Sequence, residues 1–477
     1  MQKLQKFLLL SFLVLTFTGL SLIYSPPAWA KSLVLIGGGL EPVLQNCPGD
    51  PGPNDPAFVH TQAIYEKMIE LAGGKGVAKI GVITAASGSP EDDREAGDPC
   101  LASNYQDNGD YYVEAFKQFG AAEAERIPID IDHISNKNSR EVAQQVKSLT
   151  GFFFGGGDQS RLIESFLNED NSDSLVLAAI HENYEDGAAI FGTSAGTAIQ
   201  TGGSYVRDSN LSLPMITGGQ SYEALRDPDE ELCVQEDWDD LFDECLDRDD
   251  LSYYPDGGFG FFNYGLLDTH FAERGRQGRL VRLAWEEYID DAYAPDENTA
   301  LVVTDVDTPK VEMSVVGERG VNIFDLSSVS KKTGACRRQA DSSYEKICGV
   351  KYTYLTQDDK YNPLTKTVNI ASWKSPLTGL EHHERAKSPS EDVFSSPDNR
   401  VRSGRENPRE LLYIAYDLFD SHSTKTYGET YEDDPIFKVT LTKDKACEST
   451  GYYGTFEGED FYSFKNLLLD FYVDKAS

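Results

Sequence analysis

One serine stands among small residues where a buried strand is followed at once by a helix. The motif GTSAG (residues 192–196) comes directly after the apolar run 188–191 and before the helix-like stretch 197–200. Glycines permit so tight a corner because a Cβ would clash there, and the residue at the apex is lifted out of the sheet. Ser194 is therefore a candidate nucleophile. Ordinary strand-to-helix turns also collect Gly, Ser and Thr as caps, so the motif alone leaves both readings open.

A serine nucleophile needs a base, and His270 stands out among the seven histidines of the chain. It lies at the end of an expected strand, in the run Asp268-Thr269-His270-Phe271, and three arginines follow within nine residues: Arg274, Arg276 and Arg279. A strand end with so many charged residues is unsuited to a hydrophobic core but well suited to binding an anion. The alternative is a capped helix start with solvated arginines.

A third group should orient the imidazole, and Glu297 is the candidate carboxylate because it opens the next strand along the chain. A plain charged turn is the other interpretation of this segment. A second glycine-rich strand end precedes the serine motif: the N–H groups of Gly156 and Gly157, with that of Ala195, could form an oxyanion hole. Gln159 follows and could hold a substrate amide or carboxylate.

The elements that must position these residues alternate between short apolar strands and amphipathic helices. Expected strands are 33–36, 80–84, 152–154, 188–191, 266–271 and 300–304; expected helices are 60–73, 111–119, 142–149, 172–185 and 277–288. Continuous apolar strands separated by helices predict an α/β fold with a mainly parallel, doubly wound sheet. Ligands of such sheets bind beyond the carboxyl ends of the strands, where the glycine-rich ends at 37–39, 155–157 and 192–196 converge.

At 477 residues, the chain is longer than a single catalytic domain needs, so we expect a catalytic domain with an additional part. Residues 311–316 and 320–324 are expected to form a terminal hairpin that closes a catalytic domain spanning 31–330. Residues 331–477 form an irregular, β-rich extension of unknown role, with scattered strands expected at 367–370, 411–416 and 437–441. An acidic insert, at about 206–256, interrupts the pattern: its segment 226–250 holds thirteen acids and two arginines.

The N-terminus reads as an export signal, with two lysines, an apolar run over residues 7–24 and small residues that predict cleavage after Ala30. The alternative is that this segment stays in place as an N-terminal membrane anchor. If it is cleaved, we expect no association of the mature protein with a membrane. Removing Lys3 and Lys6 changes the formal net charge from −36 to −38. So acidic a chain repels nucleic acid and favours cationic ligands, or is merely soluble. The mature protein is predicted to be periplasmic or extracellular.

Cysteines in an exported chain indicate disulfides. The candidate pairs are Cys233 with Cys245 and Cys336 with Cys348, each twelve residues apart, and Cys47 with Cys100, which leaves Cys447 over. The chain contains no CxxC motif and no cluster of Cys and His with ligand spacing. No metal site and no cofactor are therefore expected.

Four motifs in order, GGGDQSRL, IFGTSAGT, DTHFAERGRQGRL and DENTALVV, resemble the cyanophycinase and aspartyl dipeptidase family of serine peptidases. The resemblance runs from Leu33 to about Phe324 and implies a flavodoxin-like fold related to class I glutamine amidotransferases. It implies Ser194 as nucleophile, His270 as base and Glu297 as orienting group. The family's substrate-binding positions fall on Gln159, Asp268, Arg274, Arg276 and Arg279. Thr269 departs from the glutamine that commonly precedes the histidine, which puts one polar substrate contact in doubt.

The resemblance implies an exopeptidase that releases β-aspartyl-arginine from cyanophycin, a poly-aspartate carrying arginine on each β-carboxylate. The arginines of the chain could clamp the terminal carboxylates of such a substrate. Two alternatives stay open: a dipeptidase for short aspartyl peptides, and an exported binding protein without turnover. An α/β-hydrolase esterase is disfavoured because its acid precedes its histidine in the chain. Assembly into a homodimer is open as well.

Overall fold

The computed structural model of the protein describes residues 30–44, 54–98, 100–204, 211–226, 249–329, 346–387, 389–397 and 409–473, with residues 52, 206, 344 and 399 and strand β7 (Cys233–Val234). The expected signal peptide therefore lies almost wholly outside the described residues, and so does most of the acid-rich segment 226–250 of the insert. Cys47, Cys245 and Cys336 lie outside them too. Cys100 and Cys348 are disulfide-bonded, but their predicted partners are not described, so the pairings stay predictions. Cys447 is free.

The first sheet has nine strands in the order β16-β15-β12-β11-β1-β5-β4-β2-β3. Its parallel half runs from β1 to β3, and its antiparallel half begins where β11 pairs with β1. The sheet is thus mixed, with parallel and antiparallel pairs in equal number among the described strands, and not mainly parallel as expected. The strands are β1 (Leu33–Ile36), β2 (Lys79–Ile83), β3 (Glu123–Arg126), β4 (Gly151–Phe154), β5 (Ala189–Thr193), β11 (Thr299–Thr304), β12 (Glu312–Gly317), β15 (Lys360–Asn362) and β16 (Thr367–Asn369).

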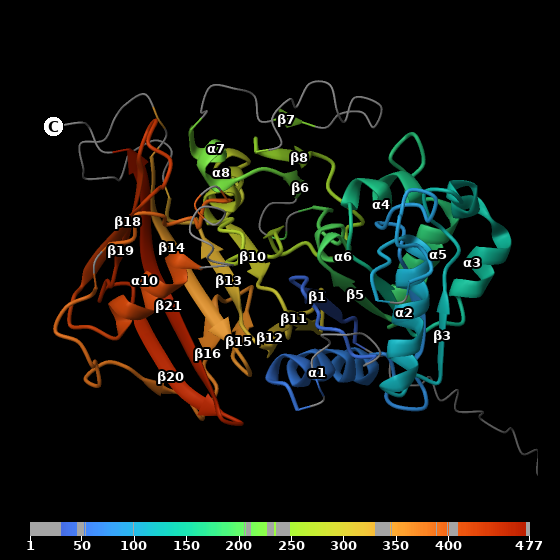
Figure 1. The fold of residues 1–477 in the computed structure, drawn as a ribbon, viewed down its shortest axis with the longest axis horizontal. Coiled ribbons are helices and arrows are strands. Elements are labelled where there is room, and N and C mark those ends of the chain that lie inside the picture. The colour runs from blue at the N-terminus through green and yellow to red at the C-terminus, as the bar shows by residue number, and fades with distance from the viewer. Residues whose placement is uncertain are drawn as a thin grey trace, which may run out of the picture.

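Helices cover both faces of the parallel half (Figure 1). One face packs under α1 (Pro56–Leu71) and α2 (Tyr105–Gln118). The other packs under α3 (Arg140–Val146), α4 (Gln159–Phe166) and α5 (Leu175–Glu185), which follow the short 3₁₀ helix Ile134–Asn138. Strand β4 shows why its sequence is apolar throughout: Phe153 enters the first core, whereas Phe152 and Phe154 enter the second. Side chains alternate between faces, so a strand covered on both sides needs apolar residues at every position.

A second nine-stranded sheet joins the middle of the chain to the C-terminal part. Its main path is β17-β20-β21-β14-β13-β10-β9, and β19 pairs with both β18 and β21. The strands are β9 (Leu266–Leu267), β10 (Asp291–Pro295), β13 (Gly320–Asp325), β14 (Ile347–Thr356), β17 (Ser375–Pro376), β18 (Lys425–Glu429), β19 (Phe437–Thr442), β20 (Thr450–Phe456) and β21 (Glu459–Val473). The C-terminal part is therefore rich in β structure, and its strand β14 pairs directly with β13, so one sheet contains strands from before and after residue 330 (Figure 1).

The remaining elements lie around this sheet. Helices α7 (Ser221–Arg226) and α8 (Gln277–Glu286) pack against each other and share one apolar core with α10 (Glu410–Phe419). A small third sheet combines β6 (Met215–Gly218), β7 and β8 (Ser252–Tyr254). No helix among the described residues is both long and apolar enough to cross a bilayer.

Two further expectations were wrong. Strands β12 and β13 do not form a hairpin: β12 pairs with β11 in the first sheet, whereas β13 pairs with β10 and β14 in the second. Gly317, with a φ of +133°, ends β12 against the backbone of Asn298, so the chain crosses between sheets there. The segment 411–416, expected as a strand, is part of α10. Its buried residues recur at helical spacing, which outweighs the β propensity of its Tyr and Ile: Leu411, Leu412, Ala415, Leu418 and Phe419.

Candidate active site

Ser194 lies at the corner between β5 and α6 (Ala195–Ala198), with a φ of 53° and a ψ of −118°. This backbone conformation is rare for a residue with a side chain and is held by its surroundings. Both glycines of the motif are required by packing. A Cβ on Gly192 would collide with the backbone of Gly196, and one on Gly196 would collide with the carbonyl of Phe154. The corner is thus closed too tightly for any other residue, as its sequence predicted.

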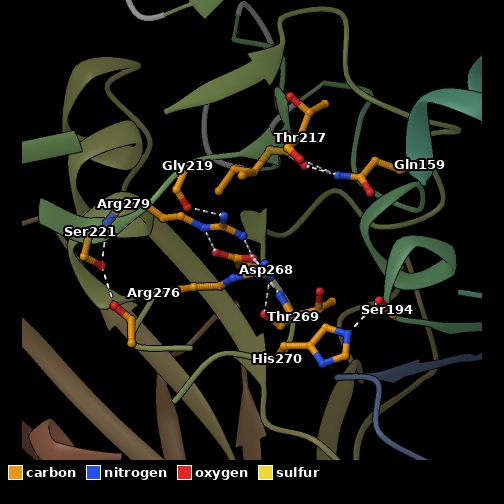
Figure 2. A network of polar contacts seen from close by, with 12 residues as sticks. Gln159, Ser194, Thr217, Gly219, Ser221, Asp268, Thr269, His270, Arg276 and Arg279 are labelled. Carbon is orange, nitrogen blue, oxygen red and sulfur yellow. Dashed lines mark hydrogen bonds and ion pairs between the residues drawn. The ribbon is translucent and has the colours of Figure 1, made fainter. Parts of the chain in front are cut away.

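The three residues singled out from the sequence are in contact. The Ser194 Oγ lies 2.7 Å from His270 Nε2, and His270 Nδ1 lies 2.7 Å from Glu297 Oε1 (the serine and histidine are drawn in Figure 2). His270 is 9% exposed, and its backbone N–H donates to the carbonyl of Gly37 at 2.8 Å. An imidazole bonded on one nitrogen to a carboxylate and on the other to a hydroxyl can accept the hydroxyl proton.

The glycine-rich end of β1 holds this histidine and glutamate. Gly38 has a φ of +97°, and a Cβ there would overlap the imidazole ring of His270. A Cβ on Gly39 would lie 2.8 Å from the Cβ of Glu297. The carbonyl of Gly38 also accepts the N–H of Asn298 at 2.8 Å. Residues 37–39 therefore form the floor against which the base and its carboxylate are packed, a role that the sequence did not reveal.

Replacing Gly38 by alanine is expected to lower kcat by ~100-fold or more, because the new methyl group must displace the imidazole. Gly458→Ala is a matched control, since Gly458 has a φ of +94° but no atom within 4 Å of a Cβ placed on it. Both changes impose the same backbone strain, so any difference in kcat reports the displaced ring. Equal activity of the two variants would contradict this role of Gly38.

Burial and neighbouring charges set the protonation of the site. Burial lowers the pKa of His270; the hydrogen bond that its Nδ1–H donates to Glu297 opposes this, whereas the charges of Arg274 and Arg276 lower it further. The hydrogen bond to His270 lowers the pKa of Glu297. A neutral histidine beside an ionised glutamate is the state in which the imidazole can act as a base near neutral pH.

Asp268 and two of the predicted arginines form a buried ionic cluster next to the histidine (Figure 2). Arg279 donates to Asp268 through Nε and Nη2, at 2.8 and 2.6 Å, and to the carbonyl of Gly219 through Nη1. Arg276 Nη1 donates to the carbonyl of Thr269 at 2.8 Å and approaches Asp268 at 3.4 Å. Arg279 is 3% exposed, so its guanidinium chiefly holds Asp268. Arg276 is half-buried and Arg274 is exposed.

The other predicted binding residues lie in the turn after β4 and at the start of α4. A Cβ placed on Gly156 would lie 3.2 Å from the Cβ of Ser194, so this turn adjoins the serine directly. Gly157, with a φ of +141°, packs on the carbonyl of Ala86 and continues the turn. Gln159 donates through Nε2 to the carbonyls of Ile216 and Thr217, at 2.9 and 3.2 Å, and so ties α4 to β6 (Figure 2).

Sequence reasoning missed a pair formed by a buried acid and an arginine, Glu273 and Arg319, which lies next to Glu297. Glu273 is fully buried and accepts the backbone N–H of Glu297 at 3.2 Å. Arg319 Nη1 lies 2.9 Å from Glu273 Oε1 and 3.6 Å from Glu297 Oε2. Burial raises the pKa of Glu273 to about 8, and the charge of Asp296 adds to this. The one signal in the sequence was an acidic residue, Glu273, placed within the arginine-rich run.

Among the described residues, no group of three His, Cys, Asp or Glu side chains is arranged to hold a metal ion.

The part of the chain that contains Ser194 is similar in sequence to known peptidases. Residues 101–233 match the sequence model of peptidase family S51. Over 174 residues, or 36% of this chain, the sequence is 28% identical to a cyanophycinase from Trichormus variabilis and equally to one from a Nostoc species. The matched segment spans 45% of the length of each of these relatives. A peptidase from an acI-B1 Actinobacterium superimposes over 62% of this chain and 91% of its own, with 17% identity and a TM-score of 0.37.

Proposed function

We propose that this chain, whose residues 101–233 match the model of peptidase family S51, is a member of that family and a serine peptidase that cleaves aspartyl peptides. The observation that carries the proposal is the pair of 2.7 Å contacts from Ser194 Oγ to His270 Nε2 and from His270 Nδ1 to Glu297 Oε1. A nucleophile, a base and an orienting carboxylate in one line are what acyl transfer needs. We propose as well that the α/β part of the chain has the flavodoxin-like fold that the resemblance implies.

In the proposed mechanism, Ser194 Oγ attacks the peptide carbonyl while His270 Nε2 takes the hydroxyl proton. The N–H groups of Gly156, Gly157 and Ala195 stabilise the oxyanion of the tetrahedral intermediate. When the C–N bond breaks, His270 returns the proton to the leaving amine and an acyl-enzyme is left. Water, deprotonated by His270, then attacks the ester and releases the acid, which regenerates Ser194.

The substrate we propose is an aspartyl peptide with a free carboxylate, with cyanophycin as the leading candidate. Arg276 Nη1 donates to the carbonyl of Thr269, the residue before His270, at 2.8 Å, and Arg274 is exposed, so both are candidates to bind an anionic group of the substrate. Asp268, which Arg279 holds through two hydrogen bonds, lies 3.4 Å from Arg276 Nη1. The similarity to two cyanophycinases over the serine region favours the polymer. The formal charge of −36 would attract the guanidinium groups that such a polymer carries.

A dipeptidase for short aspartyl peptides is the second candidate, because the same cluster of arginines suits a small anionic substrate. Incubating the mature protein with cyanophycin, β-aspartyl-arginine and α-aspartyl dipeptides, with release of products measured, distinguishes the two. Release of β-aspartyl-arginine from the polymer supports the first candidate. Hydrolysis of dipeptides alone supports the second, and turnover of none of them would favour a binding protein. We also propose that residues 1–30 direct export.

The change Glu297→Gln is expected to lower kcat/KM by up to ~10⁴-fold, and by less than loss of the histidine does, because the base stays but is poorly oriented. Glu297 raises the pKa of His270, so its loss should also move the acid limb of the pH profile to lower pH. In the wild type that limb should lie below ~6.5, the ordinary pKa of histidine.

The matched control for this change is Glu459→Gln. Glu459 Oε2 lies 2.7 Å from His60 Nε2, the same kind of contact at the same distance. The control should keep both kcat/KM and the pH profile of the wild type. An unchanged acid limb in Glu297→Gln would show that this carboxylate does not act on the base.

A further inference from the structure

The residue before the orienting glutamate is a buried aspartate with donors from three directions. Asp296 is fully buried. Its Oδ1 accepts the backbone N–H of Ala272 at 3.0 Å and the side-chain amide of Asn322 at 2.8 Å. Its Oδ2 accepts the hydroxyl of Tyr354 at 2.7 Å. Asp296 therefore connects the loop that follows His270 to the loop that carries Glu297.

Two of these donors are set by strand β14, in the C-terminal part of the chain. Tyr354 donates directly, and Tyr352 donates to the Oδ1 of Asn322 at 2.6 Å, which orients that amide toward Asp296. Both tyrosines are buried, at 1% and 0% exposure. Because the hydroxyl groups cannot reach water, their hydrogen bonds fix the side chains to which they donate.

The C-terminal part also touches the loop of the arginines. Gly275 lies between Arg274 and Arg276 with a φ of +60°, and a Cβ there would collide with the backbone of Phe394. The charge of Arg409, the residue before α10, interacts with Asp296 and Glu273. Residues beyond 330 thus contact both loops that carry the proposed catalytic and binding groups.

We propose that Tyr354 is a positioning residue for catalysis and that the C-terminal part serves as a brace for the active site. Through Asp296, the Tyr354 hydroxyl keeps the loops of His270 and Glu297 at the spacing that their 2.7 Å contact requires. This inference rests on the proposed function, since the brace matters only if His270 activates Ser194. A shift of a few tenths of an ångström in a base lowers the rate of proton transfer without changing substrate affinity.

The test compares Tyr354→Phe with Tyr472→Phe in the full-length mature protein. Tyr472 is 1% exposed, lies in β21 of the same sheet and is hydrogen-bonded to Thr440 Oγ1 at 3.0 Å, away from the active site. Each change removes one buried hydroxyl, and thermal unfolding of both variants measures what each loss costs in stability. Tyr354→Phe should lower kcat by ~10-fold with KM within about twofold, whereas Tyr472→Phe should change neither.

A second readout does not depend on the substrate. The rate at which a fluorophosphonate labels Ser194 reports how strongly His270 activates the hydroxyl. Tyr354→Phe should slow labelling by the same ~10-fold, and Tyr352→Phe, which acts through Asn322, should slow it less. Tyr352→Phe also carries the test if Tyr354→Phe does not fold.

The outcomes separate the inference from the proposed function. If the wild type is labelled at Ser194 and both Tyr354→Phe and Tyr352→Phe are labelled as fast, the brace is wrong and the peptidase proposal stands. The brace is also overturned if Tyr472→Phe slows labelling as much as Tyr354→Phe does. If Ser194 of the wild type is not labelled at all, the proposed function fails and the inference fails with it.

Discussion

Replacing Ser194 by alanine is expected to reduce hydrolysis by at least ~10³-fold, to the level that binding and the oxyanion hole alone can support. The Oγ that lies 2.7 Å from His270 Nε2 is the only atom removed, so substrate binding should persist. Single-turnover measurements on an aspartyl peptide, together with its Kd, check both parts of this prediction. Activity of Ser194→Ala within tenfold of the wild type would sink the assignment of the nucleophile.

The variant Ser194→Gly separates catalysis from folding at the same position. A φ of 53° with a ψ of −118° strains any residue that has a Cβ, and glycine relieves that strain. Ser194→Gly should therefore be as inactive as Ser194→Ala yet more stable than it, by about 1 kcal/mol in the free energy of unfolding. Urea unfolding measures the difference. Equal stability of the two variants would show that the corner is not strained.

Replacing His270 by alanine should lower kcat/KM by roughly 10³-fold or more, because no other side chain in the described part of the chain is hydrogen-bonded to Ser194 Oγ and able to take its proton. His60→Ala is the matched control. The side chains of His60 and His270 are similarly shielded, at 13% and 11% exposure, and each lies 2.7 Å from a glutamate oxygen.

Of the three histidine replacements, only that of His270 should lower the rate. The exposed His382 serves as a second control beside His60. Both His60→Ala and His382→Ala are expected to keep kcat/KM within about twofold of the wild type, since neither histidine is bonded to the serine. Thermal unfolding of all three variants shows whether any loss of rate reflects loss of fold. A large loss in His382→Ala would place the base in the C-terminal part and overturn the assignment of His270.

The sequence by itself determined the chemistry-bearing residues and the elements next to them in the chain. The corner at Ser194 could be predicted because its constraint is local: the glycines at 192 and 196 lie two residues away and must be small for the strand to turn. The strands β1, β2, β4, β5 and β11 could be predicted too. A strand buried on both faces must be apolar throughout, and that pattern is visible without any partner.

Tertiary structure alone decided which strands pair and what holds the base and its carboxylate in place. Strands β12 and β13 are adjacent in sequence and suitable for a hairpin, but β12 pairs with β11 in one sheet and β13 pairs with β10 in the other. The contact of Gly38 with His270 joins residues 232 positions apart, and that of Tyr354 with Asp296 joins residues 58 apart. Hydrogen bonds and close packing over such separations depend on the finished fold. Neither the spacing of residues along the chain nor their types reveal them.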